Sequence, residues 1–98
     1  MRVLFRPQAR AEALEAQAWS ASCAAGLGLE FARALDASVA AAVRSPETFA
    51  AVAGSCRRVL LRRFPFLMVY RANGDEFLVL AVFHHRRDPS TLVRRVGG

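Results

Sequence analysis

The stretch FPFLMVYRANGDEFLVLAVFHH, residues 64–85, decides the fold of this chain. In its first half, Phe66, Met68 and Tyr70 alternate with Leu67, Val69 and Arg71, and a β-strand presents such alternate residues on opposite faces. Asn73-Gly74 follows, and this pair favours a two-residue hairpin turn because both positions tolerate positive φ. Residues 77–83 are then all apolar, which is typical of a strand covered on both faces. We predict a β-hairpin whose second strand lies inside the sheet or is covered by a partner.

Two helices are predicted before this hairpin. Residues 9–25 are rich in Ala, Glu and Gln with a thin apolar stripe, and residues 27–43 place an apolar side chain at every fourth position. Both patterns fit the period of an α-helix, and the second is the stronger. Gly26 and Gly28 interrupt the patterns at a short connection, so the two helices should form a hairpin.

Short β-rich segments flank the helices. Residues 2–6 end at a proline, and residues 55–64 mix basic and apolar side chains at strand length. Asp88-Pro89 has the residue types of a helix start, so a short helical tail is expected. This order predicts one α+β domain over residues 1–98: an N-terminal strand, a helical hairpin and a three-stranded antiparallel meander, with the helices packed on one face of the sheet.

Length and composition exclude several classes of protein. With 98 residues, of which 54% are hydrophobic, the chain can fill one core but not two. No apolar run approaches the ~18 residues that cross a membrane, and the N-terminus does not resemble a signal peptide. We therefore expect a cytoplasmic protein with no membrane contact. Cys23 and Cys56 are expected as reduced thiols, and no Cys and His spacing suits a metal, so neither metal nor cofactor is predicted.

The charge of the chain predicts an anionic partner. All 14 basic residues are Arg, 8 residues are acidic, and the net charge is +6. A GC-rich genome alone would replace Lys by Arg. Whatever the origin of these arginines, their guanidinium groups bind phosphate and carboxylate through two parallel hydrogen bonds. We expect a nucleic acid or an acidic protein as partner.

The basic residues gather in the C-terminal half, where nine of the 14 lie between positions 57 and 95. On an extended strand, positions 58 and 62 share one face and positions 57 and 63 share the other, although a register change of one residue would exchange the two sets. A charged sheet edge that prevents aggregation would give the same pattern. The residues predicted to bind a target or another anion are Arg58, Arg62, Arg63, Arg86 and Arg87.

The usual catalytic motifs are missing. The chain has no phosphate-binding glycine loop, no HExxH and no GxSxG. His84 and His85 could transfer protons near neutral pH beside Arg86, although histidines at the end of a strand are more often structural or simply exposed. Acidic residues are sparse in this half, and Asp75 and Glu76 belong to the predicted turn. The sequence therefore does not predict a hydrolase with paired carboxylates.

Three segments together resemble a known family. They are GLGLEFARALDASVAAAVRSPETF at 26–49, RRVLLRRFPFLMVYR at 57–71 and VLAVFHHRRDP at 79–89, preceded by a helix that ends near Trp19. Over residues 2–90 the chain resembles the RelE/ParE superfamily of bacterial type II toxin–antitoxin toxins. The resemblance implies a small basic toxin that an acidic, partly disordered antitoxin neutralises in a hetero-oligomer. RelE-like members cleave mRNA in the ribosomal A site, whereas ParE-like members poison DNA gyrase without cutting RNA.

The resemblance leaves two branches to compare. In the RelE branch an Arg precedes the aliphatic–Val-Tyr stretch of the third strand, where this chain has Leu67, and the lysines of that branch are absent here. His85 and Arg86 do fall where that branch places catalytic groups. Losing one transition-state cation costs roughly two orders of magnitude in rate or more. A ParE-like gyrase inhibitor that is not an enzyme is therefore favoured. The alternatives are a ribosome-dependent endoribonuclease that uses His85 and Arg86, and an inactive toxin that still binds antitoxin.

The antitoxin is expected to cover apolar surface. Residues 77–83 and the apolar helix faces hold more apolar side chains than so short a chain would hide, and the charge of +6 favours an acidic partner. Where ParE-like chains carry an aromatic residue after the first-helix Trp, this chain has Ser20. The residues predicted to contact the antitoxin are Leu27, Phe31, Phe77, Val79 and Phe83.

Overall fold

In the computed structural model, which describes residues 1–87, 90, 94 and 95, one strand precedes two helices and four further strands. The elements are β1 (Arg2–Phe5), α1 (Pro7–Cys23), α2 (Leu27–Arg44), β2 (Ala50–Ala53), β3 (Cys56–Leu60), β4 (Phe66–Asn73) and β5 (Glu76–His84). The α+β class predicted from the sequence is confirmed. The predicted start of a helical tail at Asp88-Pro89 lies outside the described residues.

The strands form one mixed sheet in the order β1-β5-β4-β3-β2. β3, β4 and β5 make the predicted antiparallel meander, and β5 lies between β4 and the parallel strand β1, so its predicted interior position is confirmed. The prediction of three strands after the helices is too low by one. β2 was missed because its sequence, AAVA, has little β propensity, and it becomes a strand only by pairing with β3 across a turn at Gly54.

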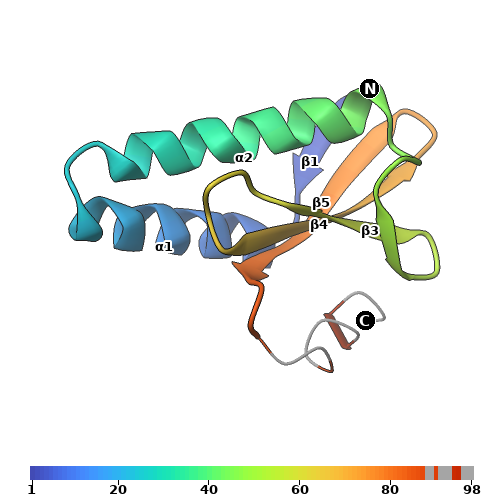
Figure 1. Cartoon of the computed structure of the whole chain (residues 1–98). Coiled ribbons are helices and arrows are strands. Elements are labelled where there is room, and N and C mark those ends of the chain that lie inside the picture. Colours follow the sequence, from blue (N-terminus) through green and yellow to red (C-terminus); the bar gives the residue numbers. More distant parts are fainter. Residues whose placement is uncertain (88–89, 91–93, 96–98) are drawn as a thin grey trace.

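Two glycines shape the helical hairpin, which lies on one face of the sheet (Figure 1). Gly26 has a φ of 80°, in the left-handed region that favours glycine, and it precedes the first turn of α2. A Cβ atom on Gly28 would lie 2.9 Å from the Cβ of Ala21, so the missing side chain lets α2 approach α1 closely. α1 begins at Pro7, whose fixed φ suits a first helical turn, slightly earlier than predicted. Neither of these helices is long and apolar enough to cross a bilayer.

The core has two parts, one on each face of the sheet. The part between helices and sheet consists of Ala9, Ala16, Phe31, Leu35, Ala42, Val59, Leu61, Met68, Tyr70, Phe77, Val79 and Val82. The part on the opposite face consists of Cys56, Val69, Leu80, Ala81 and Phe83. Ala9 and Ala16 of α1 belong to the part between helices and sheet, and their small side chains let the helix backbone lie close to its neighbours. This packing explains why the apolar stripe of α1 is thin.

A β-bulge in β5 distributes its apolar side chains between these two parts. Tyr70 pairs with Val79 and Val69 pairs with Ala81, so Leu80 is an extra residue in β5. Six of the seven residues from 77 to 83 are at most 4% exposed. The prediction that this strand holds more apolar surface than the chain can hide is therefore wrong.

Tyr70 links the sheet to the segment between α2 and β2 through a hydrogen bond. Its ring stacks on Phe77 with the ring centroids 4.6 Å apart, and its hydroxyl donates a hydrogen bond to the Pro46 carbonyl at 2.6 Å. Burial raises the pKa of the Tyr70 phenol above its ordinary value of 10.0, and the Arg57 guanidinium opposes this rise. The buried phenol is therefore held in its neutral, donating form.

Alkaline pH is expected to destabilise the protein through Tyr70. The unfolded chain loses its phenol proton near pH 10.0, whereas the folded protein keeps that proton to higher pH. Stability should be unaffected by this group below pH 10.0 and fall as the pH rises beyond it. The chain has one Tyr, so phenolate absorbance reports Tyr70 alone.

Urea unfolding on both sides of pH 10.0 checks this expectation. Tyr70→Phe should cost about 1 kcal/mol at neutral pH, through the lost hydrogen bond, and should weaken the alkaline loss of stability. Phenolate formation in the folded native protein below pH 10.0 would contradict the assignment.

Candidate functional site

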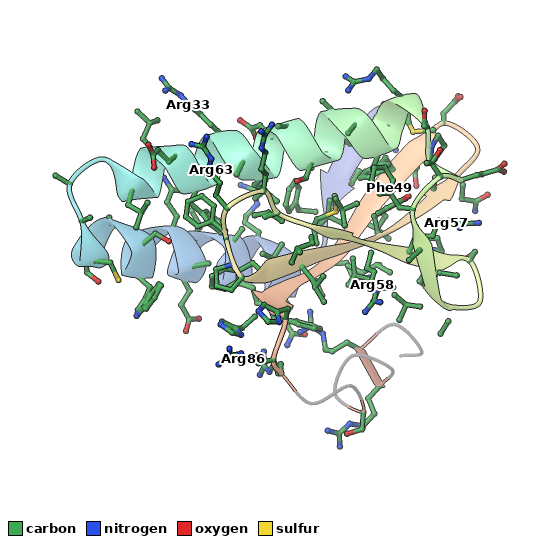
Figure 2. All side chains as sticks on the ribbon, in the orientation of Figure 1. Arg33, Phe49, Arg57, Arg58, Arg63 and Arg86 are labelled. Carbon is green, nitrogen blue, oxygen red and sulfur yellow. The ribbon has the colours of Figure 1, made fainter. Side chains whose placement is uncertain are left out.

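Arg57 and Arg58 are adjacent in β3, and their side chains lie on different faces of the sheet. Arg57 is half-buried and donates a hydrogen bond to the Phe49 carbonyl at 2.7 Å, which ties β3 to the segment before β2. Arg58 is exposed and turned away from Arg57 (Figure 2). The predicted separation of these two side chains is confirmed, and Arg58 is the more exposed of the two.

Arg62 and Arg63 lie in the loop between β3 and β4 rather than on a strand. β3 ends at Leu60, the next N–H donates to the Phe66 carbonyl at 2.9 Å, and Arg63 has a φ of 71°. The chain therefore turns where an extended strand was predicted. The prediction that Arg58 and Arg62 share a strand face is wrong.

Arg33 of α2 joins Arg62 and Arg63 around one groove of about 310 Å³. Figure 2 shows Arg33 and Arg63 on the helix side of the molecule, away from Arg58 and Arg86. The five arginines predicted as one anion site thus belong to separate surfaces. Sequence reasoning missed Arg33, because one exposed arginine on a helix gives no periodic signal.

A compact turn at the end of β5 presents the predicted histidines and two arginines. His84, His85, Arg86 and Arg87 are all exposed. The two imidazole rings stack with centroids 5.0 Å apart, and the Arg86 N–H donates a hydrogen bond to Nδ1 of His84 at 3.1 Å. The His84 ring also meets the Phe66 ring edge-on at 5.6 Å. His84 is therefore held in place, which leaves His85 and the guanidinium groups to meet a ligand.

Arg58 and His85 line the same cavity of about 520 Å³ at the edge of β3 and β4. The rest of its lining is mainly apolar and includes Leu60 and Leu67. Among the residues that the structure describes, no carboxylate lines it. The cavity can therefore hold an apolar group beside a phosphate or carboxylate, which the Arg58 guanidinium would bind.

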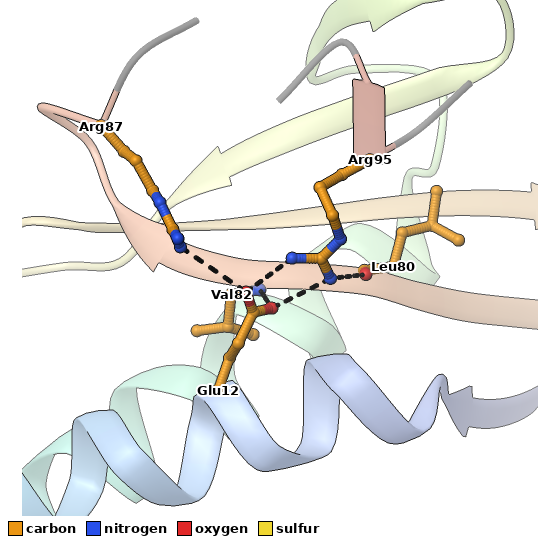
Figure 3. A network of polar contacts seen from close by, with 5 residues as sticks. All are labelled: Glu12, Leu80, Val82, Arg87 and Arg95. Atoms are coloured by element: carbon orange, nitrogen blue, oxygen red, sulfur yellow. Dashed lines mark hydrogen bonds and ion pairs between the residues drawn. The ribbon is translucent and has the colours of Figure 1, made fainter. Parts of the chain in front are cut away.

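Glu12 and Arg95 form a second polar centre, which the sequence did not predict (Figure 3). The Arg95 guanidinium donates to both carboxylate oxygens of Glu12, at 2.6 and 3.2 Å, and to the Leu80 carbonyl at 3.0 Å. Glu12 also accepts the Val82 N–H at 3.1 Å, and Arg87 lies 3.8 Å from it. The partners of Glu12 lie 70 to 83 residues away from it in sequence, so no local pattern could have revealed them.

Most residues predicted to contact the antitoxin are part of the core. Leu27 is half-buried, whereas Phe31, Phe77, Val79 and Phe83 are at most 4% exposed. A partner could reach these four side chains only by unpacking the protein. The prediction that they form a contact surface is corrected on this point, because Phe31, Phe77 and Val79 pack in the core between helices and sheet, and Phe83 packs in the core on the opposite face.

Other apolar side chains are exposed in their place. Leu14 and Trp19 on α1 and Leu29 on α2 are each more than half exposed, and Leu60 at the end of β3 is 59% exposed. Leu14 lines two neighbouring grooves along the two helices, one of about 210 Å³ and one of about 480 Å³. The two helices therefore offer exposed apolar side chains to a partner.

Comparison with known proteins identifies the family. A family model described as the ParE toxin of the type II toxin–antitoxin system parDE matches residues 3–89. Among solved structures, one described as the chromosomal ParDE TA system from P. aeruginosa has a TM-score of 0.69 and 18% sequence identity, and the match covers 86% of this chain and 95% of that chain. This structural match supports the fold alone. No curated protein matches the chain.

The matched residues run from β1 through β5 and include all the arginines of the predicted site. The resemblance drawn from the sequence is confirmed by this match. The chain belongs to the ParE family of toxins of type II toxin–antitoxin systems.

Proposed function

We propose that this protein inhibits DNA gyrase by binding it, without cleaving RNA. The cavity lined by Arg58 and His85 carries the proposal, because Leu67 lines it and no carboxylate of the described part of the chain does. Leu67 occupies the position where the resemblance to RelE-like toxins calls for a strand Arg. An apolar side chain cannot neutralise the charge that develops on a phosphate during cleavage. A mixed basic and apolar surface is instead suited to a protein partner.

The proposed neutralising partner is a small acidic antitoxin. The net charge of +6 favours association with an acidic chain, and the exposed Leu14, Trp19 and Leu29 give that chain apolar surface to cover. A toxin–antitoxin hetero-oligomer follows from these two properties.

A ribosome-dependent endoribonuclease is the second candidate. One observation favours it: His85 and Arg58 line one cavity, so a proton-transfer group and a cation lie close together. Arg58 would then replace the missing strand Arg. An inactive toxin that retains antitoxin binding is the third candidate.

Expression of the chain alone from a repressible promoter separates the three. Gyrase inhibition predicts filamentous cells with an induced DNA-damage response, and purified protein should inhibit supercoiling by gyrase in vitro. Rapid translation arrest with A-site mRNA cleavage would overturn the proposal in favour of the ribonuclease. Normal growth at a confirmed level of soluble protein would indicate an inactive toxin. Co-expression of the small acidic protein encoded beside it should restore growth and co-purify with the chain.

A further inference from the structure

Three guanidinium groups lie around one groove on the helix side of the molecule. Arg33 comes from α2, whereas Arg62 and Arg63 come from the loop between β3 and β4, and together they line the groove of about 310 Å³, which we call the helix-side groove. All three residues are exposed. Figure 2 shows Arg33 and Arg63 far from Arg58, so this groove is separate from the cavity on which the proposed function rests.

The fold does not use these three guanidinium groups. Arg57 and Arg95, by contrast, donate hydrogen bonds that tie distant parts of the chain together. Among the residues that the structure describes, no hydrogen bond or ion pair involves the side chain of Arg33, Arg62 or Arg63. Their donors are therefore available to a ligand.

The loop that carries two of these arginines is held against α2. The Phe64 N–H donates a hydrogen bond to the Leu61 carbonyl at 3.3 Å, which closes the turn. The Phe64 ring then meets the buried ring of Phe31 in α2 edge-on, with the centroids 5.4 Å apart. The loop and the helix thus hold their arginines in a fixed relation, which lowers the entropy that a ligand would lose by ordering them.

The backbone of Arg63 is strained. Its φ of 71° lies in the left-handed region, and it is the only positive φ of a non-glycine residue in the described part of the chain. A side chain at this position costs stability that glycine would not. Strained residues of this kind gather at functional sites, so the strain indicates a use for the Arg63 side chain outside the fold.

The lining of the helix-side groove favours phosphate as its ligand. Three guanidinium groups face one carboxylate, that of Glu30, so the local charge is positive. The other described lining residues are Ala34 and Phe64, and the Phe64 ring is already packed on Phe31. The centre of a protein interface is usually apolar and poor in charge. Arginines grouped with few apolar neighbours instead suit phosphate groups, which they bind through two parallel hydrogen bonds.

We propose that the helix-side groove binds the phosphodiester backbone of a nucleic acid, without selecting its base sequence. Contacts to phosphate groups position a nucleic acid but carry no sequence information. DNA and RNA offer the same backbone charge, so the shared chemistry is the row of phosphates. This inference goes beyond gyrase inhibition and does not depend on it, because the two sites lie on different surfaces.

Binding of short duplexes to the purified full-length chain tests the inference. The probes are a fluorescently labelled DNA duplex and an RNA duplex of the same length, and anisotropy gives the affinity at a series of salt concentrations. Arg33→Gln with Arg62→Gln should lower the affinity roughly tenfold. It should also reduce the slope of log affinity against log salt by about one for each lost phosphate contact. Tighter binding of one duplex identifies the nucleic acid, and these losses with either duplex support the proposal.

The matched control removes the same charge elsewhere. Arg10→Gln with Arg44→Gln alters exposed residues of α1 and α2 that do not line the groove, and Arg44 lies about three helical turns from Arg33. The salt slope of this control should stay close to that of the native chain, because distant exposed charges are screened.

Arg63→Gly separates binding from folding. The variant should reduce the salt slope by about one. Its midpoint of thermal unfolding should not fall, because glycine adopts the φ of 71° without strain. An arginine that only stabilised the loop would give the opposite pattern, with a lower midpoint and native binding.

Glu30→Gln should change the affinity in the other direction. Removing the one carboxylate of the described groove lining should tighten duplex binding about threefold, because its repulsion of phosphate is lost. Glu47→Gln makes the same change in net charge at an exposed position between α2 and β2, and it should leave the affinity near the native value.

Two results would overturn the inference. One is an equal loss of affinity and salt slope in the groove variant and its arginine control, which would reduce binding to net charge. The other is absence of binding of both duplexes to the native chain at low salt. Gyrase supercoiling is measured without reference to either result, so each proposal can fail while the other stands.

Discussion

Phe31→Ala is expected to lower the free energy of unfolding by about 3 to 4 kcal/mol, because it empties the centre of the helix-side core. Phe31 is 1% exposed, and its ring meets Phe64 and Phe66 edge-on at 5.4 and 5.5 Å. Those contacts join α2 to the loop after β3 and to the start of β4. A domain of this size is stable by roughly 5 to 15 kcal/mol, so the loss is a large share of the total.

Thermal and urea unfolding measure this effect. The midpoint of thermal unfolding should fall by roughly 4 to 8 °C for each kcal/mol lost. Leu29→Ala is the matched control, because Leu29 lies on the same helix but is 56% exposed, and it should change stability by less than about 0.5 kcal/mol. Similar small losses in both variants would show that Phe31 is not a core residue and would return it to the set of possible partner contacts.

Charge reversal at the end of β5, by Arg86→Glu with Arg87→Glu, is expected to abolish most of the toxicity. Both guanidinium groups are exposed and are predicted to bind the target, and a carboxylate in place of each would repel an anionic surface of that target. His85→Ala should have a mild effect if the protein acts by binding, because His85 then supplies one contact and no proton transfer. Cell survival after induction and the salt dependence of gyrase binding measure the two effects.

The control for charge reversal keeps the change in net charge but moves it elsewhere. Arg10→Glu with Arg44→Glu alters exposed arginines on the two helices, away from the end of β5, and should remain toxic. Circular dichroism must show that each variant folds, since Arg87 also lies over the Phe83 ring at 5.4 Å. A folded His85→Ala variant that is harmless, beside a toxic Arg86 and Arg87 reversal, would favour the ribonuclease instead.

The local patterns of the sequence determined the helical hairpin and the β4–β5 hairpin. Apolar residues at every fourth position from Leu27 specify α2, because they fall on one face of a helix whatever packs against it. Asn73-Gly74 joins two apolar strands through a turn with a φ of 60° at Gly74. The family resemblance rested on these same segments, which explains why it extended over nearly the whole chain.

Tertiary structure alone decided which residues are available at the surface. Residues 27–43 and 77–83 looked like unsatisfied apolar surface, yet Phe31 and Leu35 pack in the helix-side core, and residues 77–83 are divided between that core and the one on the opposite face of the sheet. β2 is a strand only through its pairing with β3, and Arg62 left the sheet because the chain turns after Leu60. The Glu12–Arg95 pair joins residues 83 positions apart, and a contact at that separation leaves no periodic trace in a single sequence.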